Sequence, residues 1–336
     1  MSREYLQIEK FVQDAMHSRA LQAAFDHGLI DRLLVSPLAA AEWGSERMDA
    51  SGARFLLQLL AAADVVTLAD DHAELTAAFR QALRYRDLLQ TKLKFAQLLA
   101  ADYFAKMDHL LRCAEDFMAH SVLFELFDYG NCTQVTPASC QQASRWMELT
   151  TMLTRYEAPV CAAHYAFDQH KQMLDVGGNS GEFALQVCRR SDNLQAMVLD
   201  LPAVCAVGQR HLQGTDVQAR VRFQPGNMLQ DAFPGADLIT WKSVLHDWPD
   251  DHAAHLLCKT YESLPSGGRI LIFERQAWDF SRHPTSYGLL PVFLFFRSYR
   301  TPDDYRRLLQ QAGFANIDVQ TIELEVPFLL ATARRN

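Results

Sequence analysis

Apolar residues in the first hundred positions recur at the spacing of an amphipathic helix. Two groups follow this i, i+3/i+4 pattern: Leu21, Ala24, Phe25, Leu29 and Leu33, and then Phe55, Leu56, Leu59 and Leu60. Asp49 and Ser51 precede the second group and are helix N-cap candidates. The run at 65–68, followed by a polar turn, predicts a short strand like the wing of a winged helix. We therefore expect a helical first domain at 1–100 and a helical linker at 101–165.

From about residue 170 the pattern changes to short, continuous apolar runs. These runs predict strands at 173–177, 195–200, 237–241 and 269–274, with helices between them, for example at 181–189 and 251–264. Alternation of such strands with helices is typical of a parallel sheet covered on both faces. The sequence thus predicts an α/β domain at 166–336, and such sheets bind ligands at the carboxyl ends of their strands.

The first of these strands ends in the glycine-rich loop Asp175-Val-Gly-Gly-Asn-Ser-Gly181. Glycines allow a tight turn and a close approach of the backbone to a ligand. The nicotinamide fingerprint needs glycines at n, n+2 and n+5, a spacing that Gly177, Gly178 and Gly181 do not provide. The loop also lacks the Lys-Ser/Thr ending of a P-loop. It suits a ligand without a pyrophosphate, or else serves only as a tight turn between strand and helix.

Two later strand ends carry further candidates for ligand binding. Asp200 lies about twenty residues beyond the glycine loop, where an acid accepts hydrogen bonds from ribose hydroxyls. By itself it is equally suited to cap the helix that begins near Pro202. Gly226-Asn227-Met228 can offer an amide to the edge of an adenine and a thioether to its face, or form a simple turn.

The run Trp241-Lys-Ser-Val-Leu-His-Asp-Trp-Pro-Asp250 follows the strand at 237–241. It places His246 at the ligand edge of the predicted sheet. An unperturbed imidazole titrates near neutrality, which suits a general base for a phenol or a similar acceptor. The alternative is that His246 and Asp247 only organise the start of the next helix.

Taken in order, these residues resemble the small-molecule O-methyltransferases, a family that includes plant caffeate-type, hydroxyindole and many bacterial natural-product enzymes. The resemblance covers most of the chain. It rests on residues 20–34, on Met173–Gly181, Val198–Pro202, Lys242–Pro249 and Pro265–Glu274, and on the late segment Arg300–Phe314. It implies a Rossmann-like methyltransferase domain that binds S-adenosylmethionine (SAM), and an α-helical, winged-helix-like N-terminal domain that forms a swapped homodimer.

The resemblance also implies roles for individual residues. In the expected reaction His246 deprotonates a small, aromatic acceptor, and Glu274 orients the imidazole. The expected cofactor contacts are Asp175, Gly177, Gly178, Gly181, Asp200, Leu201, Gly226, Asn227, Met228 and Lys242. The expected acceptor contacts are Trp146, Met147, Asp247, Phe293, Phe296, Arg297 and Tyr299, and the helical linker at 101–165 is expected to contribute to this acceptor pocket.

The chain departs from the family pattern at three positions. Asn179 stands where a third glycine is common, and Asn227 replaces an aspartate near the adenine. Asparagine donates and accepts hydrogen bonds, so both changes are compatible with cofactor binding. Tyr299 stands where many plant members have a second catalytic glutamate. The set of catalytic acids that the resemblance implies is therefore partial in this chain.

Charge and cysteine content narrow the class of partners. The net charge is −8 and the longest basic clusters are Lys/Arg pairs, which argues against nucleic acid or an anionic membrane as a partner. Seven cysteines at irregular spacing predict free thiols. No segment resembles a signal peptide, so a cytoplasmic protein is expected. Because no motif has metal-ligand spacing, no metal is expected.

Several functions remain open from the sequence alone. The acceptor is unidentified, and C- or N-methylation by the same fold is an alternative to O-methylation. A SAM-binding relative that catalyses another reaction, or binds the cofactor only structurally, is a second alternative. A nicotinamide oxidoreductase is disfavoured by the glycine spacing, and a DNA-binding winged helix by the acidic charge.

Overall fold

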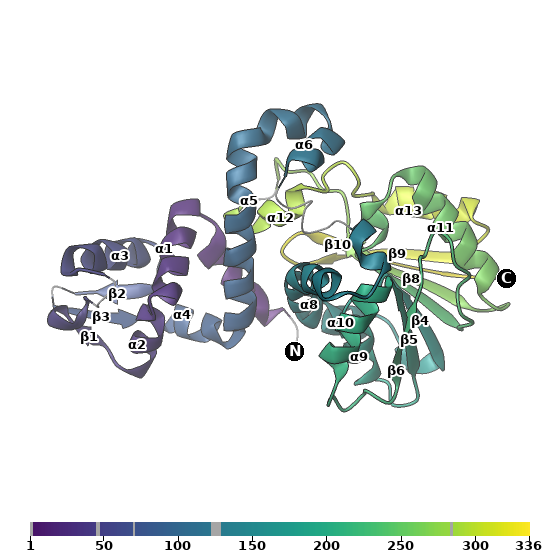
Figure 1. Cartoon of the computed structure of the whole chain (residues 1–336), viewed down its shortest axis with the longest axis horizontal. Helices are drawn as coiled ribbons and strands as arrows, with labels where there is room; N and C mark the ends of the chain where they lie inside the picture. The colour runs from purple at the N-terminus through teal and green to yellow at the C-terminus, as the bar shows by residue number, and fades with distance from the viewer. Residues whose placement is uncertain (1–2, 45–47, 70, 122–128, 283–284) are drawn as a thin grey trace. The chain divides into compact units, whose positions relative to one another are not determined.

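The computed structural model describes residues 3–44, 48–69, 71–121, 129–282 and 285–336. The chain forms two compact units (Figure 1). The first comprises residues 3–113 together with 280–293, and the second comprises residues 114–279 together with 294–336. The return of 280–293 to the first unit is not predicted from the sequence. We describe each unit by itself.

The first unit is mainly helical. Its helices are η1 (Glu4–Val12), α1 (Ala15–Asp26), α2 (Leu29–Val35), η2 (Ala40–Glu42), α3 (Ala50–Ala62), α4 (Ala77–Ala82), η3 (Leu83–Tyr85), α5 (Arg86–Arg112), η7 (Tyr287–Leu289) and α12 (Leu290–Phe293). Both apolar groups singled out in the sequence lie in helices. The Asp49 carboxylate accepts a hydrogen bond from the Gly52 amide and caps α3, as predicted.

A three-stranded antiparallel sheet completes the first unit, in the order β1 (Leu38–Ala39), β3 (His72–Leu75), β2 (Val66–Leu68). The predicted short strand at 65–68 therefore exists and pairs with the strand that follows the turn. The predicted boundary near residue 100 falls within α5, whose only non-helical backbone is at Lys106.

The second unit begins with helices and continues into a large sheet. Its helices are α6 (Ala114–His120), η4 (Tyr129–Thr133), α8 (Pro137–His164), η5 (Phe167–Gln169), α9 (Glu182–Cys188), α10 (Pro202–Leu212), η6 (Leu245–Asp247), α11 (Asp250–Ser263) and α13 (Pro302–Gln311). Its strands are β4 (Gln172–Val176), β5 (Gln195–Asp200), β6 (Val221–Pro225), β7 (Leu238–Lys242), β8 (Arg269–Arg275), β9 (Ala315–Glu323) and β10 (Pro327–Arg334). The four predicted strands agree with β4, β5, β7 and β8 to within one residue at each end.

The sheet has the order β6-β5-β4-β7-β8-β10-β9, with β10 antiparallel to both of its neighbours and the other pairs parallel. From β4 the chain runs outward to β6, returns to the other side of β4 and continues to β8. Because crossovers between parallel strands are right-handed, this reversal puts the helices of the two halves on opposite faces. Accordingly α9 and α10 lie on one side of the sheet, and α11 and α13 on the other (Figure 1). The predicted α/β fold is confirmed.

Burial in the second unit follows the sheet. Leu174, Ile239 and Ile272 from the central strands pack with Leu257 of α11 and Leu309 of α13. All seven cysteines are free thiols, as predicted. Among the described residues, none of the helices combines the length and the apolarity that a membrane crossing requires.

Candidate active site

The reversal of strand order lies between β4 and β7, and it defines the candidate site. Crevices for ligands form at such switch points, beyond the carboxyl ends of the strands. Parallel register places the ends of β4, β5, β7 and β8 at one edge: Val176 pairs with Leu199, and Lys242 with Phe273. The glycine loop, Asp200, His246 and Glu274 therefore all belong to this edge.

The glycine loop is packed too tightly for side chains at its turn. A Cβ on Gly178 would lie 2.4 Å from Asp175 Oδ2, and a Cβ on Gly177 would lie 2.9 Å from the Val244 side chain. Gly177 also has a φ of +67°, a conformation that other residues rarely adopt. Asn179 has a φ of +57°, which asparagine tolerates better than most residues. The loop geometry thus accounts for the glycines and for this departure from the family pattern.

Asp175 lies beneath the loop and is fully buried. Its Oδ1 accepts a hydrogen bond of 2.8 Å from the Thr240 hydroxyl. Burial raises the pKa of this carboxyl to about 7. The structure therefore places Asp175 under the backbone of the loop, where it supports the turn.

Helix α8 also contacts the glycine loop, through two side-chain hydrogen bonds. The Asn179 amide donates to Thr150 Oγ1 at 2.8 Å, and the Thr151 hydroxyl donates to Ser180 Oγ at 2.7 Å. The loop is thus held by side chains about thirty positions earlier in the chain.

Asp200 at the end of β5 is oriented by two backbone amides. Asn179 N donates to Oδ2 at 2.8 Å, and Leu201 N donates to Oδ1 at 2.7 Å. Burial raises the pKa of Asp200 to about 6, against the lowering effect of these two hydrogen bonds. Each carboxylate oxygen has a second lone pair that remains able to accept a hydroxyl.

The end of β6 lies beside Asp200. The Gly226 amide donates to the Asp200 carbonyl at 2.9 Å, and a Cβ on Gly226 would lie 2.9 Å from Leu199. Asn227 closes a local turn, because its Oδ1 accepts from Leu229 N at 2.9 Å. Met228 is partly buried against the core of the sheet. The structure thus brings Gly226 and Asn227 to the same edge as Asp200.

His246 and Glu274 form a buried pair across the ends of β7 and β8. His246 Nδ1 lies 3.3 Å from Glu274 Oε2, and the hydroxyl of Tyr305 in α13 donates to Glu274 Oε1. Burial acts to raise the pKa of Glu274, but the hydrogen bonds from His246 and Tyr305 outweigh it, and the pKa lies below its usual value. The glutamate is therefore an anion that accepts from both neighbours. This leaves His246 Nε2 on the far side of the ring.

Aromatic residues and a second carboxylate surround the imidazole. The ring centroids of Phe295 and Tyr299 lie 4.9 and 5.3 Å from that of His246. Asp247 Oδ1 lies 3.5 Å from His246 Nε2 and accepts a hydrogen bond from Tyr129. Burial raises the pKa of Asp247 to about 6, although the charge of His246 opposes the shift. Tyr299, in place of an acid, thus adds an aromatic face beside His246.

Lys242 belongs to a buried cluster of four charged residues. Its Nζ lies 2.5 Å from Glu157 Oε2 and donates to Thr154 Oγ1 at 3.0 Å, both on α8. Arg275 Nη2 lies 2.6 Å from Glu157 Oε1 and 2.5 Å from Glu325 Oε1. Two of the three N–H donors of Lys242 are therefore engaged by α8.

Comparison with known proteins identifies the family. The sequence model of the O-methyltransferase domain matches residues 129–315, which is more than half of the chain. The chain belongs to the O-methyltransferase domain family. The match begins at Tyr129 in η4 and continues through α13, so it includes every element that contributes to the edge described above.

Individual relatives of this O-methyltransferase domain are more distant. Acetylserotonin O-methyltransferase of Bos taurus is 32% identical over 166 residues, or 48% of each chain. The 3-hydroxy-5-methyl-1-naphthoate 3-O-methyltransferase of Streptomyces sahachiroi is 29% identical over 189 residues, 55% of this chain and 54% of that protein. The chain thus spans about half the length of these curated relatives. Crystalline human N-acetylserotonin methyltransferase in complex with SAM has the same fold, with a TM-score of 0.75, 23% identity and 96% and 94% coverage of the two chains.

The acceptor contacts expected from the family resemblance are dispersed. Trp146 and Met147 are buried in a hydrophobic cluster with Ala203 and Val204 of α10. Phe293 belongs to the first unit, where its ring packs against Phe280 at 5.4 Å. These three residues therefore occupy packed positions, and their contact with an acceptor stays a prediction.

Of the remaining acceptor candidates, two lie beside the His246–Glu274 pair. Asp247 and Tyr299 flank His246, as described above. Arg297 is exposed and its guanidinium stacks on the Phe296 ring at 4.7 Å, so a role for these two residues also stays a prediction.

Four residues of this domain take part in these contacts although no sequence pattern predicts a role for them: Tyr129, Glu157, Arg300 and Tyr305. One signal was present: Tyr305 lies at i, i+3 and i+4 spacing with Leu308 and Leu309, on the buried face of α13. A hydroxyl on such a face needs a partner. No local pattern indicates which distant group that partner is.

Proposed function

We propose that this chain is a SAM-dependent methyltransferase that transfers the methyl group to a hydroxyl of a small, aromatic acceptor. The observation that carries the proposal is the buried His246–Glu274 pair, at the same edge of the sheet as Asp200 and the glycine loop. A base and a nucleoside site at neighbouring strand ends are what methyl transfer to a hydroxyl requires.

The residues present fit SAM. Asp200 offers two carboxylate oxygens that backbone amides hold in place, as expected for binding of the ribose hydroxyls. The glycine loop leaves no room for side chains beneath its turn, which favours a ligand lying against the backbone. Leu201, Gly226, Asn227, Met228 and Lys242 are the further residues we propose to line the cofactor site. When bound, SAM supplies a methyl group on a positively charged sulfur.

Residues of the chain remove the proton from the acceptor hydroxyl. His246 Nδ1 faces Glu274, which favours the tautomer in which Nδ1 carries the proton and Nε2 accepts one. When Nε2 takes the proton of the acceptor hydroxyl, the Glu274 anion stabilises the resulting imidazolium. Phe295 and Tyr299 beside the ring offer aromatic surfaces that suit a planar acceptor.

N-methylation is the second candidate. It is favoured by the N,N-dimethyltransferase of Streptomyces rimosus, which is 29% identical over 182 residues, and by the absence of a second glutamate at Tyr299. Incubation with labelled SAM and matched panels of phenols and amines distinguishes the two. Transfer to phenols supports the proposal, and transfer only to amines contradicts it. Failure of SAM to bind removes the whole assignment.

We expect Asp200→Ala to weaken binding of S-adenosylhomocysteine by about 1–3 kcal/mol, which is the usual result of leaving hydroxyls without their acceptor. Because the pKa of Asp200 is about 6 and only the carboxylate accepts from both hydroxyls, affinity in the wild type falls as the pH decreases from 7 to 5. Isothermal titration at both pH values measures this. A pH dependence that is unchanged in Asp200→Ala would assign it to another group.

We also propose that the N-terminal domain at 1–100 joins two chains in an obligate homodimer, and that the first residues of the linker, at 101–112 in α5, extend this interface. Phe104 and Met107 on α5 are 81% and 45% exposed, and exposed apolar groups of this size favour an interface. Light scattering at micromolar concentration should give twice the 38.1 kDa of one chain. Phe104→Asp should lower this mass, and a monodisperse wild-type monomer contradicts the prediction.

A further inference from the structure

The loop that carries His246 has few backbone hydrogen bonds of its own. Between β7 and α11, Asp247 N donates to Val244 O at 3.1 Å and Trp248 N donates to Leu245 O at 3.2 Å, while Ser243 N donates to Phe273 O of β8 at 3.1 Å. Pro249 then interrupts the backbone donors, because proline has no N–H. A loop of this kind needs partners from elsewhere for its carbonyl groups.

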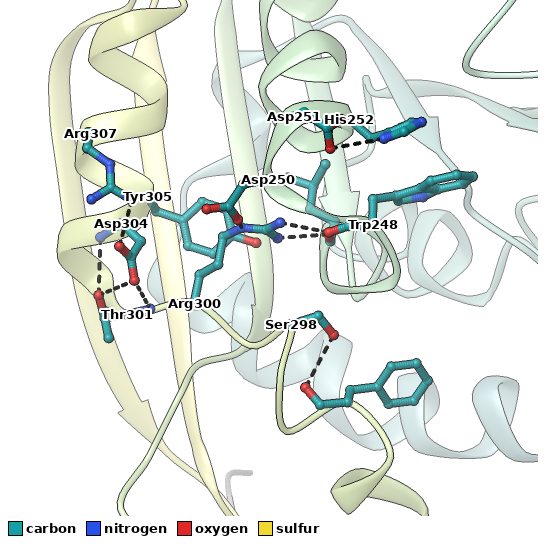
Figure 2. A network of polar contacts seen from close by, with 12 residues as sticks. Trp248, Asp250, Asp251, His252, Ser298, Arg300, Thr301, Asp304, Tyr305 and Arg307 are labelled. Carbon is teal, nitrogen blue, oxygen red and sulfur yellow. Dashed lines mark hydrogen bonds and ion pairs between the residues drawn. The ribbon is translucent and has the colours of Figure 1, made fainter. Parts of the chain in front are cut away.

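Arg300 supplies these partners with a single guanidinium group (Figure 2). Its Nη1 donates to the Leu245 carbonyl at 2.8 Å and its Nη2 to the Trp248 carbonyl at 2.7 Å. Its Nε donates to Asp250 Oδ1 at 2.8 Å. Only 4% of Arg300 is exposed. The planar guanidinium group thus binds the loop at the residue immediately before His246 and at the residue two positions after it.

Arg300 is itself fixed to the elements that hold Glu274. Its carbonyl accepts from Ala277 N at 2.9 Å, three residues beyond Glu274. Its guanidinium lies 5.9 Å from the ring of Tyr305, whose hydroxyl donates to Glu274. Thr301, the next residue, caps α13 by accepting from Asp304 N at 3.2 Å. Arg300 therefore connects the loop that carries His246 with the residues that follow Glu274 and with Tyr305, which binds Glu274.

We propose that Arg300 is a positioning residue: it holds the His246 loop at the distance from Glu274 at which the imidazole is oriented toward the acceptor. The role depends on the planar set of N–H donors and not only on the positive charge. Three nitrogens of the guanidinium group donate to three different groups, namely two backbone carbonyls and one carboxylate. The kinetic part of the proposal rests on the proposed function, whereas its structural part does not.

Arg300→Lys tests the fork, because lysine keeps the charge but cannot reproduce the planar set of donors. We expect kcat for methyl transfer to fall roughly 10–100-fold, the effect of a misplacement near 1 Å. The KM for SAM should stay within about twofold, since the proposed cofactor contacts lie at the ends of β4, β5 and β6 and at Lys242, which is held by α8. Arg300→Ala should lose more, and added guanidinium ion should partly restore it. The matched control is Arg307→Lys, in the helix α13 that follows Arg300; Arg307 is exposed and contacts Asp304 at 2.8 Å.

Hydrogen exchange of the peptide containing residues 243–250 gives a readout independent of catalysis. Arg300→Ala should exchange faster there, and Arg307→Ala should match the wild type. A wild-type kcat in Arg300→Lys, or unchanged exchange in Arg300→Ala, overturns the proposal. If exchange rises in Arg300→Ala but the wild type transfers no methyl group to any acceptor, the proposed function fails and the structural part of the proposal stands.

Discussion

Replacement of His246 by alanine should reduce methyl transfer by about 10²–10⁴-fold, the usual contribution of a positioned general base. Binding of SAM should change little, because His246 is not among the proposed cofactor contacts, which lie at the ends of β4, β5 and β6 and at Lys242 at the end of β7. Initial rates with labelled SAM, together with titration of S-adenosylhomocysteine, measure the two effects separately.

A clear interpretation of this experiment requires a suitable acceptor and matched control variants. A phenol or alcohol whose pKa is well above the assay pH is needed, because an acceptor that ionises readily does not depend on a base. His255→Ala, an exposed histidine on α11, is the matched control and should retain wild-type activity. Glu274→Gln should fall between the two, since it removes the anion that stabilises the imidazolium. Wild-type rates in His246→Ala would favour catalysis by proximity alone or C-methylation.

Replacement of Glu157 by alanine should destabilise the second unit by about 3–5 kcal/mol, as expected when one partner of a buried ion pair is removed. Glu157 is 2% exposed and lies between Lys242 and Arg275. Without it, Lys242 loses the carboxylate 2.5 Å from its Nζ, and Arg275 keeps the carboxylate of Glu325. Burial alone would raise the pKa of Glu157, but the charges of Lys242 and Arg275 outweigh it and lower the pKa to about 2.

Urea unfolding followed by tryptophan fluorescence measures the loss, because four of the five tryptophans, all except Trp43, lie in the second unit. The matched control is Glu148→Ala, an exposed position on the same helix. The lowered pKa adds a dependence on pH. The contribution of Glu157 is fully present above the unfolded pKa of 4.5 and is lost as the pH falls toward 2. Equal stability of Glu157→Ala and wild type at pH 7 would show that the charged cluster makes no net contribution to the free energy of unfolding.

The sequence by itself determined the α/β class of the second unit and the edge at which a ligand is expected to bind. Both follow from local properties. Strands β4, β5, β7 and β8 are continuous apolar runs, and such runs are stable only when covered on both faces. The glycine loop at 175–181 follows the first run directly, and Asp200 and His246 follow later ones. Because parallel strands end at the same edge of a sheet, their position in the sequence was enough to predict that they share that edge.

The tertiary structure alone decided which side chains hold that edge in place. Lys242 meets Thr154 across 88 positions, Arg275 meets Glu157 across 118, and Arg300 meets Leu245 across 55. The local sequence around each of these charged residues is equally compatible with an exposed charge on a helix or at a strand end. The choice of partner depends on burial, since a charge removed from water must find an opposite charge or a polar group wherever the packing of helices on the sheet presents one. That packing is a property of the assembled unit and leaves no periodic signal in the chain.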